Sequence, residues 1–340
     1  MKKRTSAVTG CLIAGTVLLL MPSLAQAAAY NFQTINNNGD PNFNQLLGIN
    51  SSGTIAGYFG DSVVVPNNGY TVTSPYGQGN FTAENVPGAV QTQVIGINNS
   101  GVTVGFSVDA NGTNTGFVHS GSTFTTPVVD PNTPTAVPST NQLLGLNNNN
   151  QAAGFYVNSN GNAQAYVYNI SAKTFTAINP TGATASTAAG VNNAGDVAGF
   201  LTNASGNTEA FYFNGSTFTE FEAPGSTNTG FFGLNNKGIA VGYYVDANGI
   251  TNGLVYNVLT NAWSTVNDPN GSSSPAFAVT GTTINGINDA GQLVGFFSDG
   301  THVNGLLATP TPEPASFALM GVGALLGLGM YRKFKKSGVS

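Results

Sequence analysis

The sequence predicts an all-β protein: a six-bladed β-propeller built from four-stranded repeats of about 45 residues, framed by an export signal and a C-terminal membrane helix. Three observations support this. One motif recurs six times, apolar and polar residues alternate within each copy, and the chain starts and stops at different points of the repeat. We expect a signal peptide at 1–27, the propeller at 28–309, a linker at 310–314, a transmembrane helix at 315–331 and a basic cytoplasmic tail at 332–340.

The repeated motif reads Gly, aliphatic, Asn, two variable residues, a turn residue, three further residues, then Gly and an aromatic residue. Its copies are 48, 49, 45, 43 and 53 residues apart and begin at Gly48, Gly96, Gly145, Gly190, Gly233 and Gly286. A period near 45 residues is too long for one coil of a β-solenoid and is typical of a four-stranded propeller blade.

The second copy shows the expected strands most clearly. Residues 93–98, 102–108, 116–119 and 124–126 are separated by short segments that contain Gly or Asn-Gly. Along 102–108, apolar residues alternate with small or polar ones, which is the period of a strand with one buried face. Four short strands joined by hairpins therefore make up one repeat.

Two positions of the motif carry backbone information. The turn residue is Gly in five copies and Asn150 in the third, and Asn tolerates positive φ best after Gly, so we expect left-handed backbone there. A glycine stands in mid-strand before each aromatic residue, which predicts a bulge or a close approach of backbone, and we assign that approach to the neighbouring blade. The motif asparagines are expected to bond the turn backbone through their side chains; they are Asn50, Asn98, Asn147, Asn192, Asn235 and Asn288.

The ends of the array indicate how it closes. Third-strand segments number six, but fourth-strand segments reach six only when Phe32 to Ile35 are counted with them. We therefore expect Phe32 to Ile35 to complete the last blade beside Leu306 and Leu307, because a closed ring removes exposed sheet edges. The alternative is an open β-array with capping ends.

The charge balance excludes several kinds of partner. Between Ala28 and Thr311 the basic residues Lys173 and Lys237 stand against thirteen acidic residues, a net charge of −11. Nucleic acid and nucleotide phosphates are therefore excluded as ligands, since lysine and arginine supply most of that affinity. The one cysteine, Cys11, lies within the predicted signal, so disulfides and thiolate chemistry are excluded for the mature chain.

No catalytic residue is predicted. His119 and His302 stand apart from any second ligand residue, and His119 occupies a strand position that is aromatic in other copies. Glu220 and Glu222 share one face of a strand, where paired carboxylates can hydrolyse glycosides. We interpret them as a solvated face and keep a glycan-active enzyme, using these or a rim aspartate, as the competing class.

An acidic rim is the candidate ligand site. Two hairpins place oxygen atoms at alternate positions, and two links between blades add an aspartate on the same rim. Such a rim can bind Ca²⁺ or a polysaccharide, although the twelve-residue calcium loop with its closing Glu is absent. The other interpretation is that these side chains only support turns. The residues are Asp109, Asn111, Asp130, Asp246, Asn248 and Asp268.

The two termini carry targeting signals. A basic start, an apolar stretch and the small-residue triplet Ala25-Gln26-Ala27 predict a secretory signal with cleavage after Ala27. Near the other end, the apolar run 315–331 would span about 25 Å as a helix against a bilayer core of about 30 Å. The basic residues after it predict a cytoplasmic C-terminus.

Pro312, Glu313 and Pro314, the glycine-rich apolar run and the basic terminus together resemble the PEP-CTERM sorting signal of Gram-negative bacteria. The resemblance implies recognition by an exosortase, processing near Pro-Glu-Pro, a transient inner-membrane anchor, and a final place at the cell surface or in the medium. The repeats are similar to the HAF-type extracellular repeat, but they read Gly116-Phe117-Val118 or Ala210-Phe211-Tyr212 at its His-Ala-Phe element.

We therefore expect a non-enzymatic secreted or cell-surface protein that is sorted through its tail. It is expected to bind or structure the exopolysaccharide of a biofilm matrix, without a cofactor except for the Ca²⁺ considered above. The alternatives are a secreted glycan-active hydrolase or lyase, and a spacer without a ligand.

Overall fold

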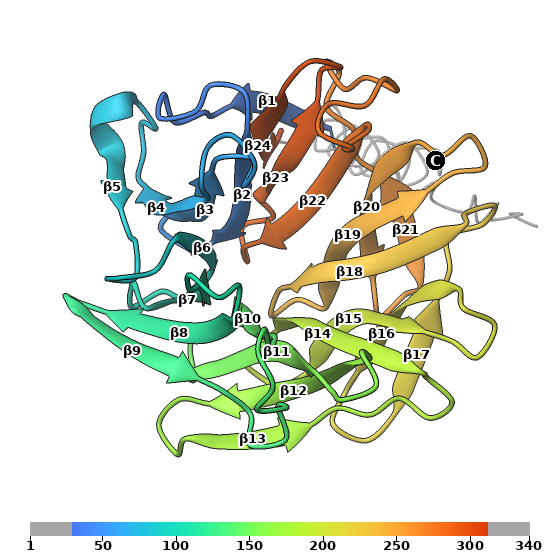
Figure 1. Ribbon diagram of the computed structural model, residues 1–340. Coiled ribbons are helices and arrows are strands. Elements are labelled where there is room, and N and C mark those ends of the chain that lie inside the picture. The colour runs from blue at the N-terminus through green and yellow to red at the C-terminus, as the bar shows by residue number, and fades with distance from the viewer. Residues whose placement is uncertain (1–28, 312–340) are drawn as a thin grey trace, which may run out of the picture.

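The chain is described over residues 29–311 of a computed structural model. This part is all β apart from the 3-10 turn η1 (Gln78–Asn80), and its sheets stand around a central axis in a propeller-like arrangement (Figure 1). The predicted signal at 1–27, the Pro-Glu-Pro residues at 312–314, the apolar run at 315–331 and the basic tail at 332–340 lie outside the described residues. Within 29–311, no helix has the length and apolar character needed to cross a membrane.

Three four-stranded antiparallel sheets follow one another in the first half of the chain. Each runs from an inner strand at the axis to an outer strand at the circumference (Figure 1). The first comprises β2 (Asn44–Ile49), β3 (Ile55–Phe59), β4 (Asn68–Val72) and β5 (Phe81–Ala83). The second comprises β6 (Gln91–Ile97), β7 (Thr103–Val108), β8 (Asn114–Ser120) and β9 (Thr123–Val128). The third comprises β10 (Asn141–Leu146), β11 (Gln151–Val157), β12 (Ala163–Asn169) and β13 (Thr174–Ala177).

The next eight strands form one sheet with two antiparallel parts. One part comprises β14 (Ala185–Val191), β15 (Val197–Thr202), β16 (Thr208–Phe213) and β17 (Phe218–Phe221). The other comprises β18 (Asn228–Leu234), β19 (Ile239–Val245), β20 (Thr251–Asn257) and β21 (Ala262–Thr265). A single parallel pair, Thr208 with Asn228, connects β16 to β18, so each part repeats the order of the earlier sheets.

The last sheet combines the two ends of the described chain. Its strands are β22 (Thr282–Ile287), β23 (Leu293–Ser298), β24 (Val303–Pro310) and β1 (Tyr30–Thr34). β1 lies antiparallel to β24, with Thr34 opposite Leu306, and the Ile35 N–H donates to the Gly305 carbonyl at 2.9 Å. The prediction that Phe32 to Ile35 complete this sheet beside Leu306 and Leu307 is confirmed.

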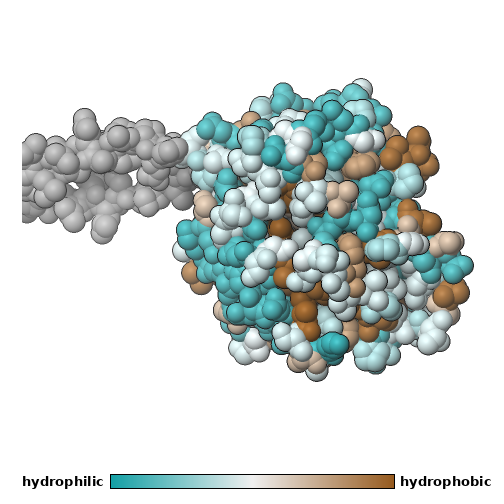
Figure 2. Space-filling view, turned by 90° about the vertical axis from the view of Figure 1, so that its left-hand side faces the viewer, coloured by the Kyte–Doolittle hydropathy of each residue, from teal (hydrophilic) through white to brown (hydrophobic). Residues whose placement is uncertain are grey.

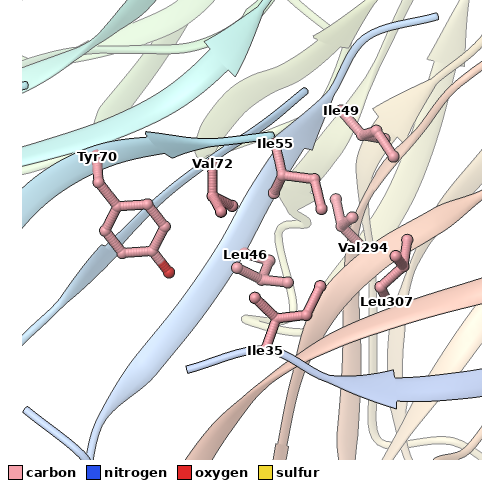
Figure 3. Close-up of a cluster of buried hydrophobic side chains, with 8 residues drawn as sticks. All are labelled: Ile35, Leu46, Ile49, Ile55, Tyr70, Val72, Val294 and Leu307. Atoms are coloured by element: carbon pink, nitrogen blue, oxygen red, sulfur yellow. The ribbon is translucent and has the colours of Figure 1, made fainter. Parts of the chain in front are cut away.

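Buried side chains join the last sheet to the first. Around this seam, Ile35 and Leu307 pack with residues of β2, β3 and β4 (Figure 3). The cluster is Ile35, Leu46, Ile49, Ile55, Tyr70, Val72, Val294 and Leu307. Since burying one large apolar side chain contributes about 1.5–3 kcal/mol, this cluster stabilises the closed arrangement.

The motif asparagine supports the turn between the first two strands of each repeat. Asn50 Oδ1 accepts hydrogen bonds from the N–H groups of Ser52 at 3.1 Å and Thr54 at 2.9 Å, and the other five copies do the same. The turn residue has positive φ in every copy, including Asn150 with φ 58°. Both predictions about this turn are confirmed.

The mid-strand glycines face a bulge, but the predicted source of the close approach is wrong. Each inner strand shifts register at the motif, as between Val94 and Gly96. A Cβ on Gly105 would lie 1.9 Å from the Gln93 carbonyl oxygen, which belongs to the inner strand of the same sheet. The neighbouring blade does not supply this contact, because the bulge pushes the inner strand's own carbonyl toward the glycine.

Contacts between sheets are made instead by the first glycine of the motif. A Cβ on Gly145 would lie 2.3 Å from the Ala189 carbonyl oxygen of β14, and one on Gly48 would lie 2.4 Å from the Ile95 carbonyl oxygen of β6. Gly286 of β22 approaches Leu47 and Gly48 of β2 in the same way. Because these glycines carry no side chain, the inner strands approach one another closely around the axis.

Candidate ligand-binding channel

A cavity of about 270 Å³ lies on the axis, and all six inner strands line it. The strands β2, β6, β10, β14, β18 and β22 contribute to its wall, with Phe106 from β7. Every inner strand runs in the same sense, because each starts where the preceding sheet ends. We call that side the link end; it holds the links between sheets and hairpins such as 109–112. We call the other side, with Asn50 and its five equivalents, the asparagine end.

Three glutamines stand in the wall toward the link end. They are Gln45, Gln93 and Gln142, and each lies three residues before the motif glycine. The equivalent residues in the other copies are Thr187, Gly230 and Thr283. The amide side chains are therefore confined to one half of the ring, on β2, β6 and β10.

Hydrogen bonds fix the orientation of these amides. Tyr58 donates to Gln45 Oε1 at 2.9 Å, Gln93 Nε2 donates to Asn67 at 2.8 Å, and Gln142 Nε2 donates to Asn114 at 3.2 Å. The opposite polar atom of each amide has no hydrogen-bond partner among residues 29–311. Half of each amide is thus held by the protein while the other half remains for a ligand.

Aromatic rings form another part of the wall. Phe232 of β18 stacks on Tyr243, with ring centroids 5.3 Å apart, and meets Phe200 edge-on at 5.9 Å. Phe106 lies in the wall beside Gln93, its cross-strand partner. These contacts hold the rings in place, so they offer fixed apolar surfaces.

One bulge residue differs from its equivalents. The residue before the motif glycine is apolar in five copies, namely Leu47, Ile95, Leu144, Ala189 and Phe232. In the sixth it is Asn285, whose Oδ1 is buried and has no hydrogen-bond partner among the described residues. An unpaired buried amide oxygen costs about 1–3 kcal/mol, so Asn285 carries a cost that its apolar equivalents do not.

Toward the asparagine end, the channel narrows to a belt of aliphatic side chains. The belt lines both the large cavity and a second one of about 60 Å³. It consists of Ile49, Ile97, Leu146, Val191, Leu234 and Ile287. The smaller cavity has room for a few water molecules only.

Beyond the belt, the asparagines are bonded to one another. Asn50 Nδ2 donates to the Asn98 carbonyl at 3.1 Å, and Asn288 Nδ2 donates to the Asn50 carbonyl at 3.1 Å. Equivalent bonds start from Asn98, Asn147 and Asn235. The side chain that forms the turn therefore also joins neighbouring sheets, a role that the turn pattern alone does not indicate.

The predicted rim residues on hairpins stabilise the turns to which they belong. Asp109 and Asp246 accept backbone hydrogen bonds, among them those from Asn111 and Asn248, whose own side chains are exposed. The backbone N–H groups of Thr113 and Ile250 chiefly lower the pKa of the two aspartates. These hydrogen bonds agree with the interpretation in which the side chains only support their turns.

The predicted rim residues on links are buried. Asp130 accepts from the Asn132 N–H at 2.8 Å, and Asp268 accepts from the Asn270 N–H at 2.8 Å. Burial raises the pKa of Asp268, whose Oδ2 has no hydrogen-bond partner in the described part of the chain. Within residues 29–311, no three His, Cys, Asp or Glu side chains gather where they could hold a metal ion. Calcium binding at this rim stays a prediction.

The histidines and the paired glutamates lie away from the channel. His119 stacks on Phe124 with centroids 4.1 Å apart, as expected of an ordinary strand residue, and its Nδ1 lies 2.7 Å from Oε1 of the buried Glu84. This pair joins two sheets and has no signal in the repeat pattern. Glu220 on β17 and Glu222 after it are exposed at the circumference.

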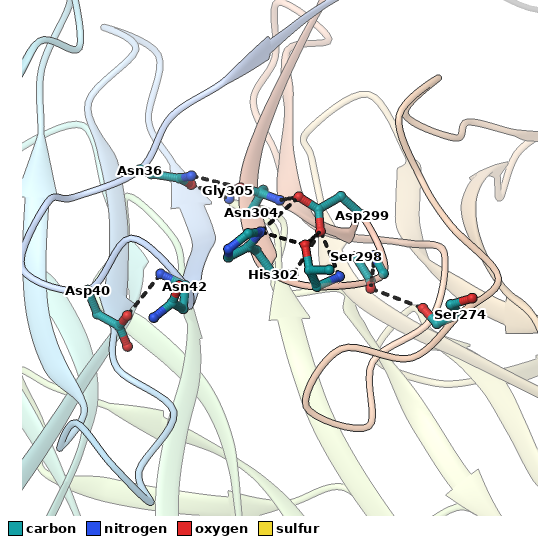
Figure 4. Close-up of polar contacts among 11 residues, drawn as sticks. Asn36, Asp40, Asn42, Ser274, Ser298, Asp299, His302, Asn304 and Gly305 are labelled. Carbon is teal, nitrogen blue, oxygen red and sulfur yellow. Dashed lines mark hydrogen bonds and ion pairs between the residues drawn. The ribbon is translucent and has the colours of Figure 1, made fainter.

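A polar chain at the link end ties the closing seam. Asp299 Oδ2 lies 3.2 Å from His302 Nδ1 and accepts from Asn304 at 3.1 Å, and Asn304 accepts from Asn36 at 2.8 Å (Figure 4). Burial alone would raise the pKa of Asp299, but hydrogen bonds from Thr301 and His302 outweigh it and hold the pKa well below its usual range. These contacts connect the β23–β24 turn to the segment after β1.

Exposed large hydrophobic residues of the described chain gather at the link end. Six of eight lie in its loops, whereas Leu259 and Trp263 lie at or beside the β20–β21 turn, on the other side. The six are Val63, Val64, Val90, Val129, Val137 and Phe277. Brown side chains protrude along the right-hand side of the domain in Figure 2. The link end is therefore the more apolar face.

The chain leaves the described domain at the opposite face. Thr311 N–H donates to the Ala29 carbonyl at 2.8 Å, and Pro310 lies beside Gly291 of a motif turn. Both ends of the described chain thus lie at the asparagine end, and the glutamine side of the channel points away from them.

Comparison with known proteins identifies the tail and the fold. The PEP-CTERM protein-sorting motif matches residues 310–333, so the predicted resemblance of the tail is confirmed. None of the curated proteins matches the sequence significantly. A putative TolB from Agrobacterium tumefaciens has a similar structure, with a TM-score of 0.53 and 10% identity over 84% of this chain and 100% of that one.

Two lectins give lower scores. SapL1 lectin in complex with alpha methyl fucoside has a TM-score of 0.48 and 14% identity over 85% of this chain and 94% of that one. A lectin from Aleuria aurantia, described as a six-bladed β-propeller, has a TM-score of 0.47 and 13% identity over 80% of this chain and 96% of that one.

Proposed function

We propose that this chain is a non-enzymatic, exported binding protein whose six-bladed propeller holds a neutral exopolysaccharide in its axial channel. Its PEP-CTERM motif directs it through a transient inner-membrane anchor to the cell surface or the medium. The partners in this proposal are an exosortase-type processing enzyme and a matrix polysaccharide of a biofilm.

The count of six blades rests on treating the eight-stranded sheet as two. One parallel residue pair joins its parts, which is much less than the pairing within either part. The contact of Gly286 with Gly48 then makes β22 and β2 neighbours, as a closed ring of six requires. The repeats belong in this proposal to the HAF type, on the sequence grounds given above.

Export is proposed from the two termini. The secretory signal at 1–27 and the apolar run at 315–331 would bring the domain across the inner membrane and hold it there until processing near Pro312 to Pro314. Mass spectrometry of the mature protein tests this sequence of events. A released protein with a peptide extending through Lys336 would refute cleavage coupled to sorting.

The proposed ligand follows from the chemistry of the channel wall. Its residues include three glutamine amides with one free polar atom each and two aromatic rings, and none of its residues is charged. Amides bond hydroxyl groups, and aromatic faces pack on the C–H faces of sugar rings, so an uncharged carbohydrate fits this wall better than an ionic ligand.

The test is binding of the full-length chain, purified in detergent, to an array of neutral and acidic oligosaccharides. We expect neutral ones to bind, and Gln93→Leu to weaken binding about tenfold, the effect of losing one to two hydrogen bonds. Gln164→Leu is the matched control, because Gln164 lies outside the channel and its side chain bonds, among residues 29–311, only the neighbouring Ala163 carbonyl. If Gln93→Leu leaves binding unchanged, the oligosaccharide does not bind in the channel.

Two further measurements address the alternatives. A reducing-sugar assay on the bound oligosaccharides should detect no release, and release that Glu220→Gln abolishes would establish the glycan-active enzyme instead. Binding should persist in EDTA, since the channel wall offers no acidic ligand to a cation. Loss of binding in EDTA would indicate that a cation is required and that the acidic rim is the binding site.

A further inference from the structure

We infer that the channel recognises an acetamido group, so that its ligand is a neutral glycan containing N-acetylated amino sugars. The acetamido carbonyl accepts a hydrogen bond from Gln45 Nε2, and the acetamido N–H donates to Gln142 Oε1. This inference rests on the proposed function and adds the chemical class of the sugar that the channel holds.

The orientation of two channel amides is set by a further hydrogen bond behind each of them. Asn67 Nδ2 donates to a backbone carbonyl at 2.6 Å, so Asn67 presents its oxygen to Gln93 Nε2. Asn114 Nδ2 donates to a backbone carbonyl at 3.0 Å, so Asn114 presents its oxygen to Gln142 Nε2 in the same way. Gln93 and Gln142 therefore each keep a carbonyl oxygen, an acceptor, that has no partner among residues 29–311.

The third channel amide has the opposite polarity. The Tyr58 hydroxyl donates to Gln45 Oε1 at 2.9 Å. Burial raises the pKa of Tyr58, so this hydroxyl keeps its proton at neutral pH. Gln45 therefore keeps its Nε2, a donor, without a partner in the described part of the chain. The wall thus offers one donor on β2 and one acceptor on each of β6 and β10.

The three unpaired glutamine atoms are accessible. Gln45, Gln93 and Gln142 are half-buried residues in the wall of the cavity of about 270 Å³. Within residues 29–311, the side-chain polar atoms that are both buried and unpaired belong to Tyr70, Thr113, Asp268 and Asn285. The glutamine atoms are not in this group, so solvent reaches them and a ligand group can replace that solvent.

A secondary amide matches the separation of this donor from these acceptors. A hydroxyl group donates and accepts at one oxygen atom, whereas a trans amide donates and accepts at two atoms that point in opposite directions. Gln45 on β2 and Gln142 on β10 stand on strands separated by β6, so they face the axis from different sides. Partners placed in this way suit an acetamido group, and Gln93 between them is left to accept from a sugar hydroxyl.

Aliphatic side chains beside the glutamines match the methyl group of an acetamido substituent. Two positions after each glutamine, the wall carries Leu47, Ile95 or Leu144. A sugar with a plain hydroxyl group leaves this apolar surface in contact with water, whereas an acetyl methyl group covers it. Burial of one such group strengthens binding about fourfold.

The absence of charge in the wall separates acetylated from free amino sugars. No residue that lines the channel is charged. A free amino sugar carries an ammonium group, which would lose its hydration here without gaining a counter-charge. Acetylation removes that charge and supplies the carbonyl that Gln45 needs.

Matched tetrasaccharides that differ only at the second carbon of each sugar test the inference. The pairs are β-1,4-linked N-acetylglucosamine against glucose, and N-acetylgalactosamine against galactose, titrated calorimetrically into the full-length chain in detergent. We expect an acetamido member to bind about tenfold tighter than its hydroxyl counterpart, from one added hydrogen bond and one buried methyl group.

Two results would separate this inference from the proposed function. If no acetamido member binds more tightly than its counterpart, but neutral glycans still bind and Gln93→Leu still weakens them, acetamido recognition is overturned and the proposed function stands. If neither these probes nor any neutral oligosaccharide of the array binds, both are overturned.

Gln45→Glu tests the assigned donor, because a carboxylate still accepts from Tyr58 but has no N–H to donate. It should weaken binding of the acetamido member about tenfold and remove the preference over the hydroxyl member. Gln142→Leu should also remove the preference, whereas Gln93→Leu should weaken both members by the same factor. Gln164→Glu, with the same change of charge outside the channel, should alter neither affinity.

The variants also give a result against the inference. An acetamido preference that survives both Gln45→Glu and Gln142→Leu would overturn the assigned contacts. Melting temperatures show whether each variant is folded, and Gln142→Leu alone decides if Gln45→Glu does not fold.

Discussion

The two ends of the axial channel are built from the same six repeats but differ in how alike the copies are. At the asparagine end, all six copies carry the same side chain, which forms the turn and in most copies bonds the next sheet. At the link end, three copies have glutamine where the others have Thr187, Gly230 and Thr283. Identity among copies marks what the closed arrangement of sheets needs, and divergence marks where the proposed glycan would be recognised.

This comparison predicts that substitutions of residues that hold the sheets and turns together act on stability, and that substitutions of the channel glutamines act on binding. The first three predictions below test that division, and the last two concern acidic residues outside the channel, whose substitution acts on stability.

The largest effect is expected at the glycine contacts between sheets. Gly145→Ala puts a methyl group 2.3 Å from the Ala189 carbonyl oxygen, so β10 and β14 must separate. We expect a loss of about 3 kcal/mol or more, at the upper end for overpacking, because backbone rather than a side chain must move. Gly79→Ala is the control, since nothing lies within 4 Å of a Cβ there. Denaturant unfolding of the two variants measures the difference.

Asn98→Ala should have the next largest effect. The N–H groups of Ser100 and Val102 would lose their acceptor, and the Asn147 carbonyl would lose a donor. We expect a loss of about 2 kcal/mol in the free energy of unfolding, because three hydrogen bonds of a partly buried turn are lost together. Glycan affinity measured on the folded fraction should stay at the wild-type value. A selective loss of affinity would mean that the asparagine end also belongs to the binding site.

Gln142→Leu should show the reverse pattern. Gln142 is half-buried in the channel wall, and its amide donates one hydrogen bond, to Asn114 at 3.2 Å. Because this single bond lies at a half-buried position, the free energy of unfolding should change by less than about 0.5 kcal/mol. Affinity for the neutral oligosaccharide should fall about tenfold. Calorimetric titration and thermal melting of the same sample report both quantities, and a large fall in stability would contradict the division.

The smallest effect concerns a buried acid at the link end. The pKa of Asp268 lies above its ordinary 3.8 because of burial, so protonation favours the folded state. The stability contributed by this group therefore rises as pH falls through its folded-state pKa, in a window above 3.8. Asp268→Asn should slightly raise the melting temperature at pH 7 and remove that rise.

Asp109→Asn is the matched control for this pH effect, with the opposite sign. Hydrogen bonds from Thr113 and Asn111 lower the pKa of Asp109, so its contribution is present above 3.8 and is lost as pH falls through the lowered pKa. Melting temperatures between pH 3 and pH 7 distinguish the two variants. Equal slopes for both would contradict the assigned directions.

Much of the fold could be predicted from the sequence because the repeat aligns six independent copies. The positive φ of Asn150, the turn-forming role of the motif asparagine and the pairing of Phe32 with the last sheet all follow from comparing copies. The source of the mid-strand approach could not be predicted. A bulge is a shift in pairing register, and one strand's sequence does not contain its partner's register.

The channel was harder to predict than the fold. The sequence predicts an acidic rim as the ligand site because carboxylates commonly bind cations and sugars. In the structure, Asp109 and Asp246 support turns, and Asp130 and Asp268 are buried. A signal for the channel did exist, since three copies share a glutamine three residues before the motif glycine. The unpaired state of Asn285 Oδ1 depends on the neighbours that the fold brings around it, and sequence does not supply those.

The pairing of β1 with β24 has a consequence for how the protein folds. Tyr30 pairs with Pro310, so the first strand made has the last strand made as its partner. Bringing such distant segments together costs about 5 kcal/mol of loop-closure entropy, and contacts of this range slow folding. Until β24 emerges, β1 has no partner and its edge can pair with other chains. Folding of the ring is therefore a late event, completed only after the whole domain has been synthesised.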